Sequence, residues 1–345
     1  MGSGEEFFQT ASARFQSAAE RTGLLVRCVQ IAGRSVRLRF AGKALAERVL
    51  PAFTHLAEAA DPPELTIDSF DALTTGTPLP PACWTSSDVG ARGEINGLGD
   101  ERFRMLLDRG ARSMSCYDEL ERHALFFLRK HDDLMFWQMA FPLRQILSWW
   151  ASGFGALLLH AAAVGERDGV ALIPGLGGLG KSSTALSCLL DGMGYLGDDT
   201  CLVAPAEPSL VHSLYSAAKL LPDALARLPE LRPLGINVPD AINTKVVVPL
   251  GERFAAQMLE QAPVTAIVVP ERTGRTSTSF TRVTSVRALH ALAPNSMFNL
   301  VGVGAEGMRS MARIARSAPV FRLELGKDRA AVVRAVRDIL AEAHA

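Results

Sequence analysis

Residues 175–182 read GLGGLGKS and fit the phosphate-binding loop pattern G-x-x-x-x-G-K-[ST]. The preceding residues 169–174 (GVALIP) form an apolar run typical of a buried strand. Residues 183–190 (STALSCLL) begin a helical pattern. A strand, a glycine-rich loop and a helix in this order predict an α/β architecture, in which strands and helices alternate and pack in layers. The alternative is a glycine-rich turn that binds nothing.

The residue types of this loop suit the binding of phosphate. Glycines allow positive φ angles and let backbone N–H groups approach phosphate oxygens, and the N-terminus of the following helix carries partial positive charge. The pattern places Lys181 on the β and γ phosphates and the Ser182 hydroxyl on Mg²⁺. The predicted phosphate-binding residues are Gly175, Leu176, Gly177, Gly178, Leu179, Gly180, Lys181, Ser182 and Ser183.

Composition excludes several other classes of function. The 345 residues have a formal net charge of zero, which argues against binding to nucleic acid or to an anionic membrane surface by charge neutralisation. The longest apolar stretch, 149–164, is too short to span a bilayer. Five scattered cysteines without a C-x-x-C pair give no zinc pattern. An odd number of cysteines and a polar N-terminus predict a cytoplasmic protein.

Periodicity predicts a smaller N-terminal α+β domain over residues 1–140. We expect a helix over 5–21, a hairpin of strands 24–31 and 35–40, a helix over 43–60 and a strand over 65–70. Residues 74–100 are rich in Pro, Gly, Thr and Asp and are predicted to form a loop or linker. Three further strands are expected at 103–107, 113–117 and 125–128.

The second predicted domain, 141–345, contains the glycine-rich loop. Pro142 suits the first turn of a helix, and strands are expected at 155–164, 170–174, 195–203, 244–249, 264–269 and 320–325. An amphipathic helix over 329–343 closes the chain.

Two adjacent aspartates follow the loop helix. Asp198 and Asp199 lie within the expected strand 195–203, where extended neighbours point to opposite faces. One carboxylate at this place can hold Mg²⁺, and a second can accept a proton from an attacking hydroxyl. The alternative is an exposed Gly-Asp-Asp turn.

Three isolated residues are further candidates. His160, on the expected strand before the loop strand, is either a core residue or a group near the phosphates. Lysines are few in this arginine-rich chain, so Lys219 and Lys245 are either phosphate clamps or solvated surface charges.

The order of these residues resembles the HPr kinase/phosphorylase family and its relatives, which carry a histidine on one strand, then a phosphate-binding loop, then a strand with Asp-Asp. The resemblance covers about residues 157–203, with LLLHAAAV before the loop, LGDDTCLV after it and PVFRLELG near the end. It implies an HPr kinase C-terminal, phosphoenolpyruvate carboxykinase-like domain with a mixed sheet. It also implies ATP and Mg²⁺ as cofactors, and a serine on a protein or peptide as acceptor.

Residue roles carried over from the family follow the matching positions. Asp199 would accept the proton, His160 would support catalysis, Lys181 would bind phosphate, and Asp198 with Ser182 would bind the metal. The segment 229–235 (PELRPLG) is an altered version of a family signature and suggests Glu230 as a further metal ligand and Arg232 as a phosphate contact. A homo-oligomer is expected by analogy.

Two departures separate this chain from HPr kinase itself. Leu176 and Gly177 stand where the family loop has Asp-Ser, and the later loop that engages the HPr serine has no clear copy. HPr as substrate and the reverse phosphorylase activity therefore do not follow. The alternatives to a protein kinase are a small-molecule kinase, an ATP-binding regulatory module and a scaffold with a decayed loop. The intact Lys181, Ser182 and aspartates argue against the last.

Overall fold

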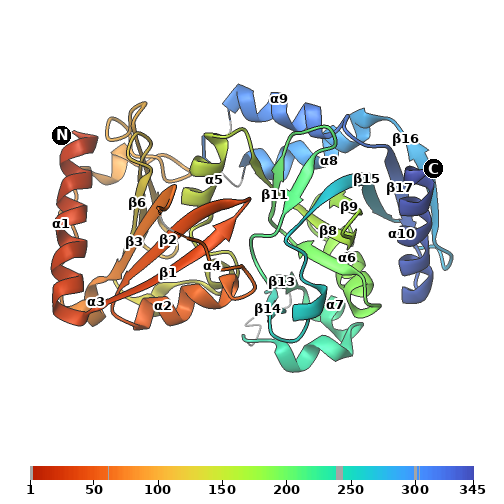
Figure 1. Ribbon diagram of the computed structural model, residues 1–345, viewed down its shortest axis with the longest axis horizontal. Coiled ribbons are helices and arrows are strands. Elements are labelled where there is room, and N and C mark those ends of the chain that lie inside the picture. Colours follow the sequence, from red (N-terminus) through yellow and green to blue (C-terminus); the bar gives the residue numbers. More distant parts are fainter. Residues whose placement is uncertain (1–2, 61, 238–243, 299–300, 303) are drawn as a thin grey trace. The chain divides into compact units, whose positions relative to one another are not determined.

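The computed structural model describes residues 3–60, 62–237, 244–298, 301–302 and 304–345. The chain divides into two compact units, residues 1–150 and 151–345, each drawn with its elements in Figure 1. Both units combine helices with a sheet that contains parallel and antiparallel pairs, so the chain is α/β with mixed sheets.

The first unit is built on a sheet with the strand order β1-β2-β3-β6-β5-β4. Its strands are β1 (Leu24–Ile31), β2 (Arg34–Ala41), β3 (Leu65–Asp71), β4 (Phe103–Asp108), β5 (Ser113–Asp118) and β6 (His123–Leu128). Its helical segments are α1 (Gly4–Thr22), α2 (Ala44–Val49), η1 (Leu50–Phe53), α3 (Ala72–Thr75), η2 (Ser86–Asp88), η3 (His131–Asp133) and α4 (Phe136–Ala140). Helix α5 (Arg144–Ser152) runs across the division between the units.

Helix α1 begins at a capping box, in which Ser3 Oγ accepts from the Glu6 amide and the Glu6 carboxylate accepts from the Ser3 amide. Its buried residues Phe8, Ala11 and Phe15 recur at helical spacing and contribute to one hydrophobic core with residues of β4, β5 and β6.

Two predictions for the first unit need correction. The helix expected over 43–60 is shorter, because Pro51 follows α2 and its missing N–H ends the α-helical hydrogen bonding. The segment 74–100 is largely irregular, but Val89, Ile95 and Leu98 are buried in the core of the first unit. It is therefore a packed loop within that unit and not a linker.

The second unit has a larger mixed sheet with the order β10-β8-β9-β15-β12-β11-β7, to which β17 and β16 add beyond β15. The strands are β7 (Leu157–Leu159), β8 (Ala161–Glu166), β9 (Gly169–Pro174), β10 (Gly194–Gly197), β11 (Cys201–Ala204), β12 (Leu210–His212), β15 (Gln261–Arg272), β16 (Ser279–Val283) and β17 (Val320–Leu325). A separate pair consists of β13 (Ala217–Leu220) and β14 (Val246–Pro249). The helical segments are α6 (Lys181–Leu190), α7 (Pro222–Ala226), η4 (Pro229–Leu234), η5 (Ala255–Gln257), α8 (Ser285–Phe298), α9 (Gly304–Ile314) and α10 (Arg329–His344).

The side chains of β9 point alternately into two hydrophobic cores, one on each face of this sheet. Ala171 and Ile173 face one core with α6 and α10, whereas Val170 and Leu172 face the other with α8 and α9. Helices therefore cover both faces of the sheet, which explains why β9 is apolar at every position and shows no polar alternation.

Two strands predicted as continuous are each divided. The expected strand 155–164 becomes β7 and β8 with His160 between them, and the expected strand 195–203 becomes β10 and β11 with residues 198–200 between them. The period-2 pattern could not show these breaks, because the residues on either side of each break are buried and apolar.

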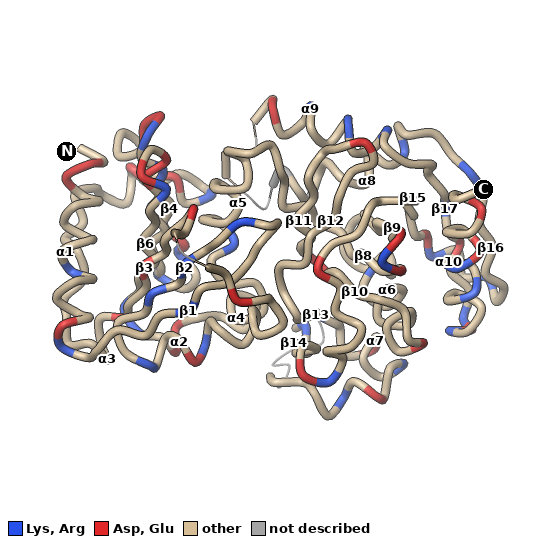
Figure 2. The backbone as a smooth tube through the Cα atoms, viewed as in Figure 1, with Lys and Arg blue, Asp and Glu red and all other residues tan. Residues whose placement is uncertain are grey.

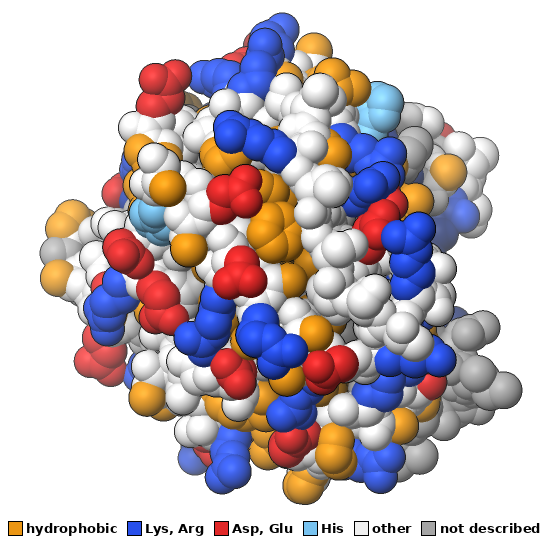
Figure 3. Space-filling view, turned by 90° about the vertical axis from the view of Figure 1, so that its right-hand side faces the viewer, with side chains coloured by type: hydrophobic (Ala, Val, Ile, Leu, Met, Phe, Trp, Pro, Cys, Tyr) orange, Lys and Arg blue, Asp and Glu red, His pale blue; other side chains and the backbone are white. Residues whose placement is uncertain are grey.

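On the side of the second unit that carries α10 and β16, acidic and basic side chains are interspersed (Figure 3), in line with the zero net charge. No helix within the described ranges has both the length and the apolar character needed to cross a membrane.

We predict that Ile339→Ala destabilises the second unit by about 2–5 kcal/mol, because it empties a fully buried position of α10 beneath the sheet. The matched control is the exposed neighbour Asp338→Ala, which should change the free energy of unfolding by less than about 0.5 kcal/mol. Urea unfolding followed by circular dichroism measures both. Equal effects of the two variants would contradict the assigned core.

Candidate functional site

The predicted glycine-rich loop joins β9 to α6, so the strand, loop and helix occur in the predicted order. Gly175, Gly178 and Gly180 have φ angles of 148°, 83° and 108°, which side chains with a Cβ rarely adopt. At Gly180 a Cβ would also lie 2.3 Å from Leu325 Cδ1 of β17. The backbone conformation of the loop thus favours glycine at these three positions.

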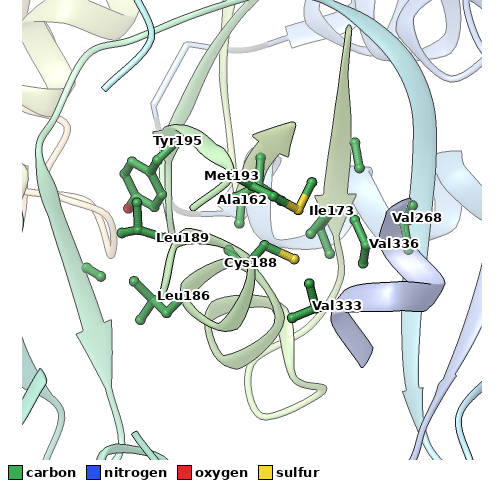
Figure 4. Packing of buried hydrophobic residues seen from close by; sticks show 14 of the residues in the cluster. Ala162, Ile173, Leu186, Cys188, Leu189, Met193, Tyr195, Val268, Val333 and Val336 are labelled. Carbon is green, nitrogen blue, oxygen red and sulfur yellow. The ribbon is translucent and has the colours of Figure 1, made fainter. Parts of the chain in front are cut away.

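Helix α6 is fixed in place by the core beneath it. Figure 4 shows Leu186 and Leu189 of α6 among buried side chains that include Ile173 of β9 and Val333 of α10. This packing holds the helix N-terminus, where Lys181 is the first helical residue, against the end of the loop strand. A fixed helix N-terminus is a favourable place for an anion.

The breaks in two neighbouring strand pairs bring His160 and the aspartates together. Gly197 of β10 pairs with Ala163 of β8, and Cys201 of β11 pairs with Leu159 of β7. Residues 160–162 therefore lie opposite residues 198–200. Asp199 adopts a φ of 62°, a conformation that Asp tolerates better than most residues. Asp199 is therefore not extended, and the alternation of faces expected for two extended aspartates does not apply to this pair.

Asp199 is the centre of a buried cluster of charges. Its Oδ2 lies 2.8 Å from Lys219 Nζ, and its Oδ1 lies 3.6 Å from Lys245 Nζ and 3.8 Å from His160 Nδ1. His160 Nδ1 also lies 3.0 Å from the backbone oxygen of Asp199. A carbonyl oxygen only accepts, so Nδ1 carries the hydrogen and Nε2 keeps a free electron pair.

The charges of this cluster shift the ionisation of its members. Burial alone would raise the pKa of Asp199, but Lys219, His160 and Lys245 together hold that pKa well below its ordinary value. Burial lowers the pKa of His160 to about 4, against the opposing effect of Asp199. At neutral pH the cluster therefore contains an ionised Asp199 and a neutral His160.

Asp198 has a different environment although it is the next residue. It is fully buried, its Oδ2 lies 3.5 Å from the Lys219 amide, and its Oδ1 has no hydrogen-bond partner among the described residues. Burial and the neighbouring Asp199 charge raise the pKa of Asp198 to about 6, against the effects of Ser182 and Lys181. The two adjacent carboxylates thus have pKa values shifted in opposite directions.

A small pocket beside the loop is lined by the groups that a phosphate chain requires. The lining cations are Lys181, Lys219, Lys245, Arg227 and Arg272, and the loop residues in the lining are Gly177, Gly178, Gly180, Ser182 and Ser183. Lys181 is only 5% exposed, and its Nζ donates to the Leu176 carbonyl oxygen at 2.9 Å. Burial lowers the pKa of Lys181, against the effects of Asp198 and Asp199.

The residues present fit a magnesium ion that also contacts nucleotide phosphates. Such an ion usually takes one or two protein carboxylates and completes its shell with phosphates and water. Asp198 supplies a buried carboxylate oxygen without a hydrogen-bond partner among the described residues. The Ser182 hydroxyl lies close enough to the same carboxylate to lower its pKa. In the described part of the chain, no group of three or more His, Cys, Asp or Glu residues could hold a metal ion without such a ligand.

The structure brings most of the predicted residues together and separates two of them. His160, Lys181, Ser182, Asp198 and Asp199 meet at the site.

Glu230 does not join this group; on η4 it forms a 2.7 Å ion pair with Arg329 near the surface, so the structure gives no support to its predicted role as a metal ligand. Arg232 likewise lies on η4, where it donates to the Ala226 carbonyl oxygen and does not line the loop pocket.

The structure places Lys219 and Lys245 beside Asp199 and adds two arginines to the pocket lining. The interpretation of Lys219 as a solvated surface charge is wrong, because its side chain is 12% exposed and pairs with Asp199. Lysine is rare in this chain, and this rarity made Lys219 and Lys245 candidates in the sequence. Arg227 and Arg272 of the pocket lining carried no such signal, because arginine is common in the chain and their placement depends on the fold.

Comparison with known proteins gives a limited result. No protein-family model and no curated protein matches the chain. Among the solved structures that match is that of the Hpr(Ser) kinase/phosphatase from Coxiella burnetii, with 11% sequence identity and a TM-score of 0.31. The match covers 55% of this chain and 99% of that protein. It is a distant structural similarity.

The raised pKa of Asp198 predicts a specific dependence of stability on pH. A carboxyl whose pKa is higher in the folded state favours folding when protonated, and this contribution is lost as pH rises from about 4 to about 6. Over this range the titration of Asp198 should lower the free energy of unfolding of the wild type by an amount on the order of 3 kcal/mol. Asp198→Asn should not show this decrease, and it should keep the opposite contribution of Asp199. Urea unfolding at pH 4, 5, 6 and 7 measures the difference. Parallel pH profiles for the two proteins would contradict the assignment.

Proposed function

We propose that this protein is an ATP- and Mg²⁺-dependent phosphotransferase that phosphorylates a hydroxyl group. The observation that carries the proposal is one pocket in which the glycine-rich loop, Lys181, Lys219 and Lys245 converge, with two buried carboxylates next to it. Phosphoryl transfer depends chiefly on positioning and on charge stabilisation, and this pocket offers both. A serine of a protein or peptide as the acceptor rests on the sequence resemblance.

In the proposed reaction, the loop amides and Lys181 hold the phosphates of ATP. Ser182 and Asp198 would hold Mg²⁺, which would neutralise part of the phosphate charge. The acceptor oxygen forms a bond to the γ-phosphorus while the bond from that phosphorus to the ADP oxygen breaks. The proton of the acceptor hydroxyl passes to Asp199.

The pairing with Lys219 and Lys245 does not favour Asp199 as a proton acceptor, because the two lysines hold its pKa low. Both lysines also line the phosphate pocket, so bound phosphates compete with Asp199 for them. As the lysines turn toward the phosphates, the pKa of Asp199 rises and its carboxylate becomes able to accept a proton. His160 holds Asp199 in place by donating from Nδ1 to its backbone oxygen.

We predict that Asp199→Asn lowers phosphoryl transfer by about 10²–10⁴-fold and does not weaken ATP binding, because the two lysines that pair with Asp199 stay available to the phosphates. Asn tolerates the positive φ at this position, so the backbone should keep its conformation. Transfer from γ-labelled ATP to acceptors in a cell extract and direct ATP titration measure the two properties. The exposed Asp191→Asn, which loses only a surface ion pair with Arg337, is the matched control.

Transfer by Asp199→Asn at the wild-type rate would contradict the role of Asp199. ATP binding by the wild type without any labelled acceptor would instead favour an ATP-binding regulatory module. Lys181→Met should weaken ATP binding in either case, because it removes the buried ammonium group of the loop.

A further inference from the structure

Helix α8 places one hydroxyl group against the strand break at His160. Ala288, Leu292 and Ser296 follow one another at intervals of four residues, so they lie along the same face of the helix. Their exposed fractions are 0%, 0% and 2%, and the first two belong to the hydrophobic core on this face of the sheet. Arg287 is the one Lys, Arg, Asp or Glu in the sequence of α8, and the rest of the helix is tan in Figure 2. Ser296 is thus a polar group at the end of a buried stripe whose other two members are apolar.

The partner of this hydroxyl is the backbone amide of His160. The N–H group of His160 donates to Ser296 Oγ at 3.0 Å, across 136 positions of the sequence. His160 lies between β7 and β8, where the strand pairing ends at Leu159 and begins again at Ala161. A backbone N–H away from water needs an acceptor, and the hydroxyl supplies one where the strand is interrupted. Ser296 therefore stabilises the break that brings His160 to the site.

The other contacts of this break lead to residues 198–201, where β10 ends and β11 begins. The Cys201 thiol donates to the Ala161 carbonyl oxygen at 3.3 Å, and the His160 ring donates from Nδ1 to the backbone oxygen of Asp199 at 3.0 Å. His160 is thus held at its amide by α8 and at its ring by Asp199. A displacement of the amide also moves the ring, and a hydrogen bond weakens steeply when its geometry departs from alignment. The contact of Ser296 with the amide is therefore coupled to the contact of the ring with Asp199.

We propose that Ser296 is a positioning residue, which holds His160 so that the His160 ring fixes Asp199 for proton transfer. Ser296 lies outside the lining of the phosphate pocket, so it acts through His160 and not on the phosphates. Its effect on phosphoryl transfer rests on the proposed function, whereas its effect on the His160 ring does not. A misplacement of about 1 Å in a reacting group can lower a rate by about a hundredfold, so we expect an effect on rate and not on ATP affinity.

The test compares Ser296→Ala, which removes the acceptor, with Ser296→Thr, which keeps the hydroxyl and adds a methyl group. Ser310→Ala is the matched control, because Ser310 is a buried serine of α9 whose Oγ accepts from Arg313. ¹⁵N NMR of protein with labelled histidine, at neutral pH, shows which nitrogen of the His160 ring carries the hydrogen, and His160→Asn assigns the signals. Transfer from γ-labelled ATP to acceptors in a cell extract gives the maximal rate and the ATP concentration at half-saturation. Circular dichroism checks that each variant is folded.

We expect Ser296→Ala to lower the fraction of His160 rings that carry the hydrogen on Nδ1, because the ring no longer stays aligned with Asp199. The maximal transfer rate should fall by about 10–100-fold, and the ATP concentration at half-saturation should stay within about twofold of wild type. Ser296→Thr should restore the Nδ1 hydrogen and bring the rate to within about threefold of wild type. Ser310→Ala should change neither property.

A folded Ser296→Ala protein that keeps either the wild-type His160 ring or the wild-type transfer rate would overturn the inference and leave the proposed function standing. Equal losses in Ser296→Ala, Ser296→Thr and Ser310→Ala would also overturn it, because a general loss of packing would then explain them. A wild-type protein that transfers no phosphate from ATP would contradict the proposed function itself, and the NMR comparison would still test the hold of Ser296 on His160.

Discussion

The contact between buried Asp199 and the ammonium groups of Lys219 and Lys245 organises the candidate site. Three elements distant in sequence meet there, because Asp199 lies between β10 and β11, Lys219 lies on β13, and Lys245 precedes β14. A buried charge is costly unless it is paired, so each partner keeps the others in place. The contact therefore fixes the wall of the pocket that faces the glycine-rich loop.

The same contact explains why the pKa values of the two neighbouring aspartates, Asp198 and Asp199, are shifted in opposite directions. Asp199 has the lysines, whereas Asp198 is buried beside the Asp199 charge with one oxygen unpartnered. Asp199 is thus kept ionised, whereas the pKa of Asp198 is raised to about 6. Adjacent carboxylates with opposite pKa shifts are a recurrent arrangement where a site divides two roles between similar groups.

The sequence predicted the parts of this site that depend on local pattern. The loop, its strand and its helix follow from the glycine spacing and the apolar run of β9, and the layered α/β class follows from the alternation of elements. The strand breaks at His160 and Asp199 could not be predicted, since both lie in apolar surroundings and their cause is the pairing of distant strands. Pairing of Asp199 with Lys219 depends on the same tertiary arrangement.

In the proposed function, phosphates and Asp199 compete for the same two lysines. The most direct test is the pKa of the Asp199 carboxyl, measured by ¹³C NMR with and without tripolyphosphate. We predict a low pKa in the free protein that rises when tripolyphosphate binds, because the lysines turn toward the phosphates. A pKa that stays low while tripolyphosphate is bound would contradict it.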